Sequence, residues 1–327
     1  MAVKITRRTI VVSAIGLAAG RCFPAFAKDE WPLHVVRMIS PYGAGGANDI
    51  SLRIISEQLE HSLGQPFIVE NKPGAGTRLA NETVAHAAPD GSTFLYAAAP
   101  YATAEALFGK LGYDPKKDLV PVAMAVVAPL FLIISAQAPF KDLKEMISYG
   151  KSQPNGLMFA SPGAGSQPHL AAELLFRDAG IKRLNVPFRG DAMAYTELLA
   201  GRVDATLTAI STALPYIQDG KFRVLGVAAT APSPTYPQVP TLREQGLPNV
   251  VAAGWYGFMA PAATPRSIVD RLQGEVNIVL ADPDVQKKLF ALGLEAHGTT
   301  GVEFGKFIDE ETSKWSQLIH EAGLKDQ

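Results

Sequence analysis

The fold class is decided by the stretch Val35-Val36-Arg37-Met38-Ile39-Ser40-Pro41-Tyr42-Gly43-Ala44-Gly45-Gly46-Ala47-Asn48-Asp49. The β-branched run from Val35 to Ile39 predicts a strand, and the glycine-rich loop after it predicts a tight connection. Beyond the loop, Leu52, Ile55 and Leu59 recur at helical spacing, which indicates an amphipathic helix. A strand, a loop and a helix in this order form the unit of parallel α/β sheets.

The same unit recurs along the chain. Phe67 to Val69 leads into the loop Asn71 to Thr77, and Leu157 to Ala160 leads into the loop Ser161 to Ser166. Further strands are expected at 94–97, around 186 and at 224–228, and helices at 169–177 and 192–199. About 300 residues exceed one such core, so two α/β domains are predicted.

Two apolar segments are predicted to pass between the domains. Val120 to Ile134 is nearly uncharged, but Pro121 and Pro129 interrupt it too often for a membrane span. We interpret it as a crossing strand and Val250 to Met259 as its return. The predicted organisation is an export signal at 1–27, lobe I at 28–127, lobe II at 128–250, and a return crossing to lobe I with C-terminal helices at 251–327.

Two helices near the C-terminus have start signals. Thr264 is predicted to cap a helix whose first residue is Pro265. Thr300 and Glu303 have the spacing of a capping box, and apolar residues follow them at helical intervals.

The N-terminal residues predict export. Arg7-Arg8 precede the uncharged run Ile10 to Ala19, which is about half the length of a membrane-spanning helix. Ala25-Phe26-Ala27 fits a signal-peptidase site, so cleavage near Ala27 and a periplasmic mature protein are expected. The arginine pair is compatible with a twin-arginine (Tat) signal and equally with a Sec signal.

Composition excludes several classes of function. The chain has a net charge of −1, and the predicted signal holds four of the cations, so nothing attracts nucleic acid. The single cysteine, Cys22, lies in the signal, and the six histidines are scattered without zinc-site spacing. We therefore expect a monomer without disulfides, bound metal or cofactor.

The three glycine-rich loops are the candidate binding elements. Glycine lets a backbone approach a ligand closely, and each loop opens a helix whose unpaired N–H groups attract anions. Such junctions lie at the carboxyl edge of an α/β sheet, where ligands bind. Any one loop is equally compatible with a plain tight turn, but Ser161 and Ser166 add hydroxyl donors that a turn does not need. His169 is interpreted as a packing residue, because no partner for a catalytic base is spaced to it.

The mature chain resembles the substrate-binding proteins of tripartite tricarboxylate transporters, the Bug family. The resemblance lies in Pro41-Tyr42 with Gly45-Gly46 and Asp49, Asn71-Lys72-Pro73-Gly74-Ala75-Gly76, Pro89-Asp90-Gly91, Tyr113-Asp114-Pro115 with Lys117-Asp118, Gly163 with Gly165-Ser166 and His169-Leu170, Val186-Pro187-Phe188-Arg189-Gly190, Gly201 with Val203-Asp204, Val239-Pro240-Thr241 and Trp255-Tyr256-Gly257. It implies a two-lobed periplasmic-binding-protein (Venus flytrap) fold that closes on a small carboxylate and delivers it to membrane transporter subunits. A solute receptor of this kind is not an enzyme.

The resemblance also implies a set of ligand-binding residues. Tyr42 is expected to form an aromatic wall, Ser161 and Ser166 to donate hydrogen bonds, and Asp204 to orient the site. The complete set is Tyr42, Gly43, Ala44, Gly45, Gly46, Asp49, Gly76, Thr77, Ser161, Gly163, Ser166, Asp204 and Thr208.

Some positions depart from the family pattern. Ala44 stands at a common proline, Thr77 at a common glycine, and Thr208 at a common acidic residue. Arg78 either pairs with a second ligand carboxylate or is an exposed helix-start arginine. Arg189 either reaches the cleft or lies on the surface beside a turn. Trp255 and Tyr256 are expected to pack at the interlobe crossing, with a ligand-facing role open for one of them.

Three other functions compete with transport. A nucleotide-dependent enzyme is suggested by Gly43 and Gly45, but Asn48 stands where the dinucleotide fingerprint needs a third glycine. A serine hydrolase is disfavoured because Ser166 lacks both flanking glycines of a nucleophile elbow. A ligand sensor that presents its closed form to a membrane signalling protein remains an alternative, since closure creates a new surface for either partner.

Overall fold

The computed structural model describes residues 31–161, 166–188 and 190–325 of the chain. The predicted signal with Cys22, the loop glycine Gly163, and Arg189 lie outside the described residues. The chain separates into two units, Met1–Trp31 and Pro32–Gln327, and every element below belongs to the second. No helix in the described part of the chain has the length and apolarity needed to cross a membrane.

Lobe I contains a parallel sheet whose central strand is β1. Strand β1 (Val36–Ser40) lies between β2 (Phe67–Asn71) and β3 (Thr93–Ala98) and is parallel to both. The helices of this region are α1 (Ala47–Leu63), the 3-10 helix η1 (Ala75–Thr77), α2 (Arg78–Ala85), the 3-10 helix η2 (Ala99–Ala102) and α3 (Ala104–Phe108). The predicted strand–loop–helix unit around Pro41 to Asp49 is therefore confirmed.

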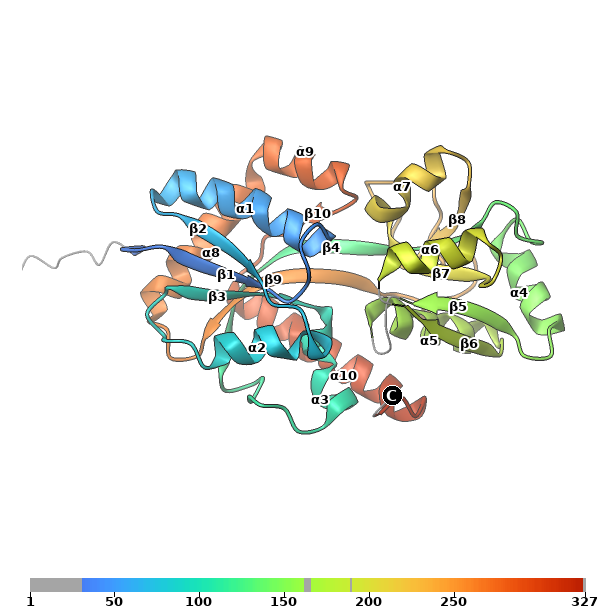
Figure 1. Ribbon diagram of the computed structural model, residues 1–327, viewed down its shortest axis with the longest axis horizontal. Coiled ribbons are helices and arrows are strands. Elements are labelled where there is room, and N and C mark those ends of the chain that lie inside the picture. The colour runs from blue at the N-terminus through green and yellow to red at the C-terminus, as the bar shows by residue number, and fades with distance from the viewer. Residues whose placement is uncertain (1–30, 162–165, 189, 326–327) are drawn as a thin grey trace, which may run out of the picture. The chain divides into compact units, whose positions relative to one another are not determined.

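Two antiparallel strands, β4 (Leu119–Ser135) and β9 (Ala253–Pro261), connect the lobes. Strand β4 pairs with β9 as far as Pro129, and from Leu130 it pairs with strands of lobe II. Figure 1 shows both strands running from the lobe that contains β1 toward the lobe that contains β7. The two segments that were predicted as a crossing strand and its return correspond to β4 and β9.

Lobe II repeats the parallel arrangement. Strand β5 (Leu157–Ser161) lies between β6 (Arg183–Pro187) and β7 (Ala205–Ala209), parallel to both. Strands β7 and β8 (Phe222–Val227) each pair antiparallel with β4. Its helices are α4 (Leu143–Ser152), α5 (Gln167–Ala179), α6 (Asp191–Leu199) and α7 (Ile210–Gln218).

The C-terminal segment adds three helices, of which the sequence predicted two. They are α8 (Arg266–Ala281), α9 (Pro283–Ala291) and α10 (Gly301–Glu321), with the short strand β10 (Glu295–Ala296) between the last two. The capping box of Thr300 and Glu303 is confirmed. The predicted cap at Thr264 is wrong, because Pro265 has an extended ψ of 134° and itself occupies the N-cap position.

The sheet order places the interlobe crossing beside several strand ends. The order is β2-β1-β3-β9-β4-β7-β5-β6, so β2 and β6 lie at the far edges and β9 and β4 at the centre.

Helix α10 joins two hydrophobic cores: its Phe304 packs with Trp255 of lobe I, and its Trp315 belongs to the cluster around Phe159 of lobe II.

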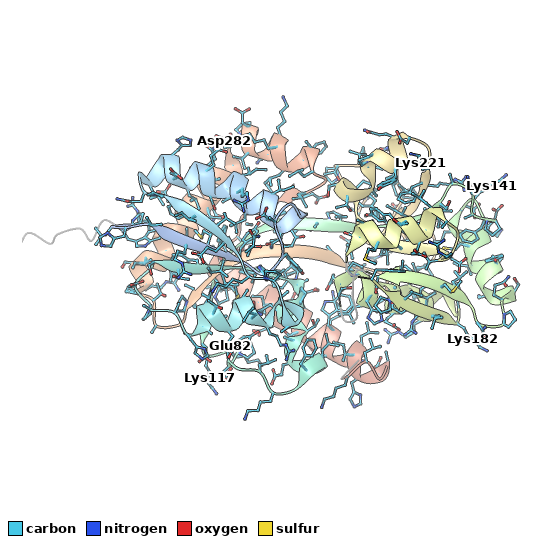
Figure 2. The ribbon with its side chains drawn as sticks, viewed as in Figure 1. Glu82, Lys117, Lys141, Lys182, Lys221 and Asp282 are labelled. Atoms are coloured by element: carbon cyan, nitrogen blue, oxygen red, sulfur yellow. The ribbon has the colours of Figure 1, made fainter. Side chains whose placement is uncertain are left out.

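Many charged side chains lie on the outside of this framework. In Figure 2 the labelled Glu82 and Lys117 project from the outside of lobe I, and Lys141, Lys182 and Lys221 from the outside of lobe II. Buried apolar side chains fill the space between the sheets and helices.

Candidate functional site

A cavity of about 520 Å³ lies at the interlobe crossing. It is lined by Tyr42, Gly43, Gly46, Ala47, Asn48, Ala99, Pro100, Ala128, Leu130, Ser166, Gln167, Pro168, Gly190, Asp191, Thr208, Ala209, Thr212, Gly254, Trp255 and Tyr256. These residues come from the carboxyl ends of β1, β3 and β7, from the loops after β5 and β6, and from both crossing strands. Both lobes therefore contribute to one site.

Four helix N-termini meet at this cavity. Helix α1 contributes Gly46 and Asn48, α5 contributes Ser166, α6 contributes Gly190, and α7 contributes Ala209. Helices α1, α6 and α7 have no side-chain cap, so their first N–H groups need another partner. Helix N-termini also carry partial positive charge. The cavity can thus attract an anion although no lysine, arginine or histidine of the described residues lines it.

Three of the cavity-lining residues have buried polar atoms without partners. Asn48 is 2% exposed; its Oδ1 accepts from Ser40 at 2.7 Å, but its Nδ2 has no partner. Gln167 is 6% exposed, and both atoms of its amide are unpartnered. The indole Nε1 of the fully buried Trp255 is unpartnered as well. Because an unsatisfied buried polar group costs about 1–3 kcal/mol, these donors indicate a ligand or water in the cavity.

On the lobe II side, Thr208 and Thr212 line the cavity and belong to a cluster of hydroxyl groups. The hydroxyl of Tyr195 lies 2.8 Å from Thr208 Oγ1 and 2.6 Å from Thr212 Oγ1. Asp191, at the first turn of α6, is half-buried beside them. Burial raises the pKa of Asp191 to about 6, although a hydrogen bond from Thr208 favours the ionised form.

The structure brings five of the predicted ligand residues to the cavity. Tyr42, Gly43 and Gly46 line it from the first loop, and Ser166 and Thr208 line it from lobe II. Ala44 and Gly45 belong to the same first loop but do not line the cavity. The side chain of Ser166 also caps α5 by accepting from the His169 N–H at 3.4 Å.

Asp49 stabilises the first loop through hydrogen bonds. It is 2% exposed, and its carboxylate accepts hydrogen bonds from Gly45 N at 2.9 Å, Asn71 Nδ2 at 2.9 Å and Arg53 Nε at 3.1 Å. Burial alone disfavours the charge, but these donors hold the pKa of Asp49 below its usual value. Asp49 does not line the cavity, so the geometry gives it a positioning role in place of the predicted ligand contact.

The second glycine-rich loop lies away from the cavity. Gly76 and Thr77 belong to η1, which follows the edge strand β2, and neither lines the cavity. Arg78 stacks over the Phe108 ring at 4.0 Å and donates to the carbonyl of Ala75 at 2.7 Å. Arg78, which was considered as a partner for a second ligand carboxylate, therefore contacts Phe108 and Ala75 and does not line the cavity.

Ser161 and Asp204 are also outside the lining. Ser161 is fully buried at the end of β5. Asp204 precedes β7 and accepts from the Met158 N–H at 2.7 Å, which aligns β7 with β5. Because the cavity is at the carboxyl end of β7 and Asp204 is at its amino end, the residue is too distant for direct orientation of a ligand.

Sequence reasoning missed several lining residues. Asn48 was considered only as a departure from a dinucleotide fingerprint, and Gln167, Asp191 and Thr212 were not considered at all. A usable signal existed for Asn48, Gln167 and Asp191, since each lies in the first turn of a helix that follows a predicted strand. No strand was predicted before α7, which carries Thr212. His169, predicted to be a packing residue, is buried on α5 with Nε2 3.1 Å from Glu173.

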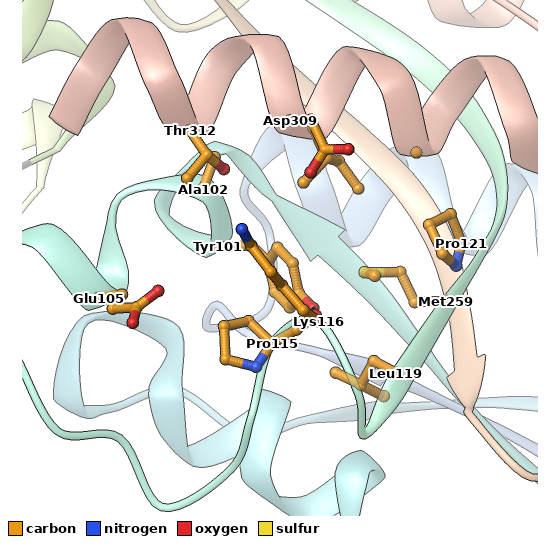
Figure 3. Close-up of a pocket in the computed structure, with 12 residues that line it drawn as sticks. Tyr101, Ala102, Glu105, Pro115, Lys116, Leu119, Pro121, Met259, Asp309 and Thr312 are labelled. Atoms are coloured by element: carbon orange, nitrogen blue, oxygen red, sulfur yellow. Dashed lines mark hydrogen bonds between the residues drawn. The ribbon is translucent and has the colours of Figure 1, made fainter. Parts of the chain in front are cut away.

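A smaller hollow of about 340 Å³ lies between α10 and the chain around η2. Figure 3 shows Tyr101 and Pro115 in it, below Asp309 and Thr312 of α10. The Tyr101 hydroxyl already donates to the Pro115 carbonyl at 2.5 Å, and no lining side chain has an unpartnered buried polar atom. The larger interlobe cavity is therefore the stronger candidate site.

Two α/β lobes joined by crossing strands around a cavity lined with donors define the class of periplasmic-type solute-binding proteins. Comparison places the chain within that class. It belongs to the family described as tripartite tricarboxylate transporter family receptors, whose model matches residues 51–324. Members of this family are receptors and not enzymes.

Individual relatives agree with this assignment. Protein BugT of Bordetella pertussis is 32% identical over 98% of this chain and 99% of its own. MatC of Rhodopseudomonas palustris, solved with bound malate, is 37% identical with a TM-score of 0.78 over 88% of this chain and 99% of its own. R. palustris Rpa4515, solved with adipate, is 29% identical with a TM-score of 0.83 over 90% of this chain and 98% of its own.

Proposed function

We propose that this protein is an exported receptor that binds a small carboxylate between its lobes and delivers it to a membrane transporter of the tripartite tricarboxylate type. The observation that carries the proposal is that four helix N-termini and three buried side chains with unpartnered polar atoms meet at one cavity. Such a set of neutral donors suits a carboxylate, which accepts several hydrogen bonds at once. The malate and adipate in the related structures support the same ligand class.

Hinge closure is the proposed mechanism. The lobes are joined near Pro129 and Leu130 of β4 and near Ala252 and Ala253 at the start of β9, where few residues need to change conformation. A carboxylate that contacts both lobes stabilises the closed state, which is the state the transporter is proposed to recognise. The lobe boundaries at 28–127, 128–250 and 251–327, the periplasmic location, the monomeric state and the cleavage near Ala27 remain predictions.

A thermal-shift screen tests this proposal. The purified protein is heated with mono-, di- and tricarboxylates, aromatic acids, amino acids, nicotinamide cofactors and neutral sugars. A ligand that binds only the folded state raises the melting temperature, and a concentration 100 times Kd adds about 2.7 kcal/mol of stability. We expect a shift from at least one carboxylate and none from the sugars or cofactors. A shift from a cofactor or sugar without any from a carboxylate would contradict the receptor assignment.

A further inference from the structure

Asp191 is the one ionisable carboxylate among the cavity-lining residues of the described chain. It lies on the first turn of α6, and its negative charge helps to raise the pKa of Tyr42 and Tyr256, which line the same cavity. An acidic side chain at this place is unexpected in a cavity whose other polar atoms are donors for an anion. The presence of Asp191 therefore constrains which groups, besides a carboxylate, a ligand can have.

Asp191 has no fully charged partner among the described residues that line the cavity, and the N-terminus of α6 supplies only partial positive charge. No lysine, arginine or histidine of the described residues lines the cavity. The groups that face Asp191 are the Thr208 hydroxyl, which donates to it, and the phenols of Tyr42, Tyr195 and Tyr256. Burial raises the pKa of all three phenols, so they remain neutral at physiological pH.

A neutral donor is thus already present, whereas the described lining residues supply no full positive charge. A half-buried carboxylate without a cation is destabilised, and an opposite charge within hydrogen-bond distance relieves this. A ligand ammonium supplies that charge and donates hydrogen bonds as well. A second ligand carboxylate at the same place would instead be repelled.

We propose that Asp191 makes the cavity selective for aminocarboxylates, whose carboxylate binds the donors of α1 and α5 and whose ammonium group donates to Asp191. This inference rests on the proposed carboxylate-receptor function and narrows it to one ligand class. Asp191 is the specificity-determining residue, and the helix ends with Asn48 and Gln167 form the general carboxylate cradle.

The assignment predicts opposite pH responses for two ligand types. Ionised Asp191 favours an ammonium ligand, so lowering the pH from 8 to 5, through the Asp191 pKa of about 6, weakens aminocarboxylate binding about tenfold. Protonated Asp191 no longer repels a second carboxylate, so dicarboxylate binding strengthens over the same range. The same pH series with the Asp191→Asn variant measures the effect of the ligands' own protonation, which is then subtracted from the pH dependence of the unmodified protein.

Calorimetry with ligands of matched shape tests the proposal. Three series change one substituent from hydrogen to hydroxyl to ammonium: succinate, malate and aspartate; glutarate, 2-hydroxyglutarate and glutamate; 3-phenylpropionate, phenyllactate and phenylalanine. At pH 8 we expect the amino member of the series that fits to bind at least about tenfold more tightly than the unsubstituted one. Asp191→Asn should abolish that preference. Asp219→Asn, which removes an exposed carboxylate paired with Lys221 outside the cavity, should preserve it.

The outcomes separate the two proposals. If carboxylates bind but the unsubstituted member is equal or better, or if Asp191→Asn leaves the preference unchanged, Asp191 is not an ammonium selector. If the hydroxy member binds best, the selected group is a neutral donor and the ammonium assignment is wrong. If no compound of any series binds and the wider carboxylate screen is also silent, the receptor function itself fails.

Discussion

The first and second glycine-rich loops of lobe I have similar sequences but different positions relative to the cavity. Both follow a strand of the same parallel sheet and precede a helix. The loop after β1 contributes Tyr42, Gly43 and Gly46 to the cavity, whereas no residue of the loop after β2 lines it. The difference comes from the sheet order, because β1 is an interior strand and β2 is the edge strand farthest from the crossing.

This comparison shows what a glycine-rich junction does and does not determine. Each junction can supply free N–H groups, but only those near the topological crossing face a ligand. The edge loop has a structural role, since Asn71 at the end of β2 donates to the Tyr42 carbonyl and to Asp49, each at 2.9 Å. The second loop region therefore supports the first.

The largest expected effect on ligand affinity comes from a bulky side chain in the first loop. Gly46 has φ −83°, a conformation open to any residue, and its missing Cβ meets only Gly43 O at 4.0 Å. Gly46→Val should place a branched side chain in the cavity and weaken carboxylate binding on the order of 100-fold, measured by calorimetry. Gly274→Val, on the exposed side of α8 with open space around it, is the matched control and should bind normally. Normal binding by Gly46→Val would remove the first loop from the site.

An intermediate effect is expected where the two loops meet. Asn71→Ala removes three side-chain hydrogen bonds, one of them to a buried carboxylate and one from the exposed Arg53, and should lower the free energy of unfolding by about 2 kcal/mol. Ligand affinity should also fall several-fold, because Tyr42 loses its support. Urea denaturation and calorimetry measure the two effects. Unchanged affinity with lowered stability would mean that the loops are independent.

The smallest effect is expected within the second loop. Thr77 has φ +75°, which disfavours a β-branched residue, and its buried Oγ1 has no partner. Thr77→Gly should raise the free energy of unfolding by about 1 kcal/mol, net of the entropy that glycine adds to the unfolded chain. Affinity for a carboxylate should not change. A loss of affinity on this substitution would place the second loop in the site after all.

The fold was largely predictable because its signals are local. Strand–loop–helix units and the two proline-broken crossing strands follow from periodicity and punctuation within about 15 residues. Helix α9 was missed, since Pro283 at its start lies only two residues after α8 ends and the sequence shows no intervening loop. The cap at Thr264 was misplaced because Pro265 adopts an extended ψ, which composition does not reveal.

The site was only partly predictable because it depends on which strands are neighbours in the sheet, and these strands are far apart in the sequence. The first loop and the Ser166 loop were found from their glycines and hydroxyls. The second loop was included although sheet order puts it at an edge, and that order is not contained in any single segment. Gln167 and Asp191 carry no motif, and their importance follows only from burial beside a cavity.

The most direct test of the central claim uses Gln167→Leu. Gln167 has two buried, unpartnered amide atoms at the cavity, and leucine fills a similar volume without polar atoms. If the amide exists to hold a ligand, removing it should leave the unliganded protein as stable or more stable while weakening carboxylate binding about 10- to 100-fold by calorimetry. Unchanged affinity for the carboxylate would contradict the assignment of the interlobe cavity as the binding site.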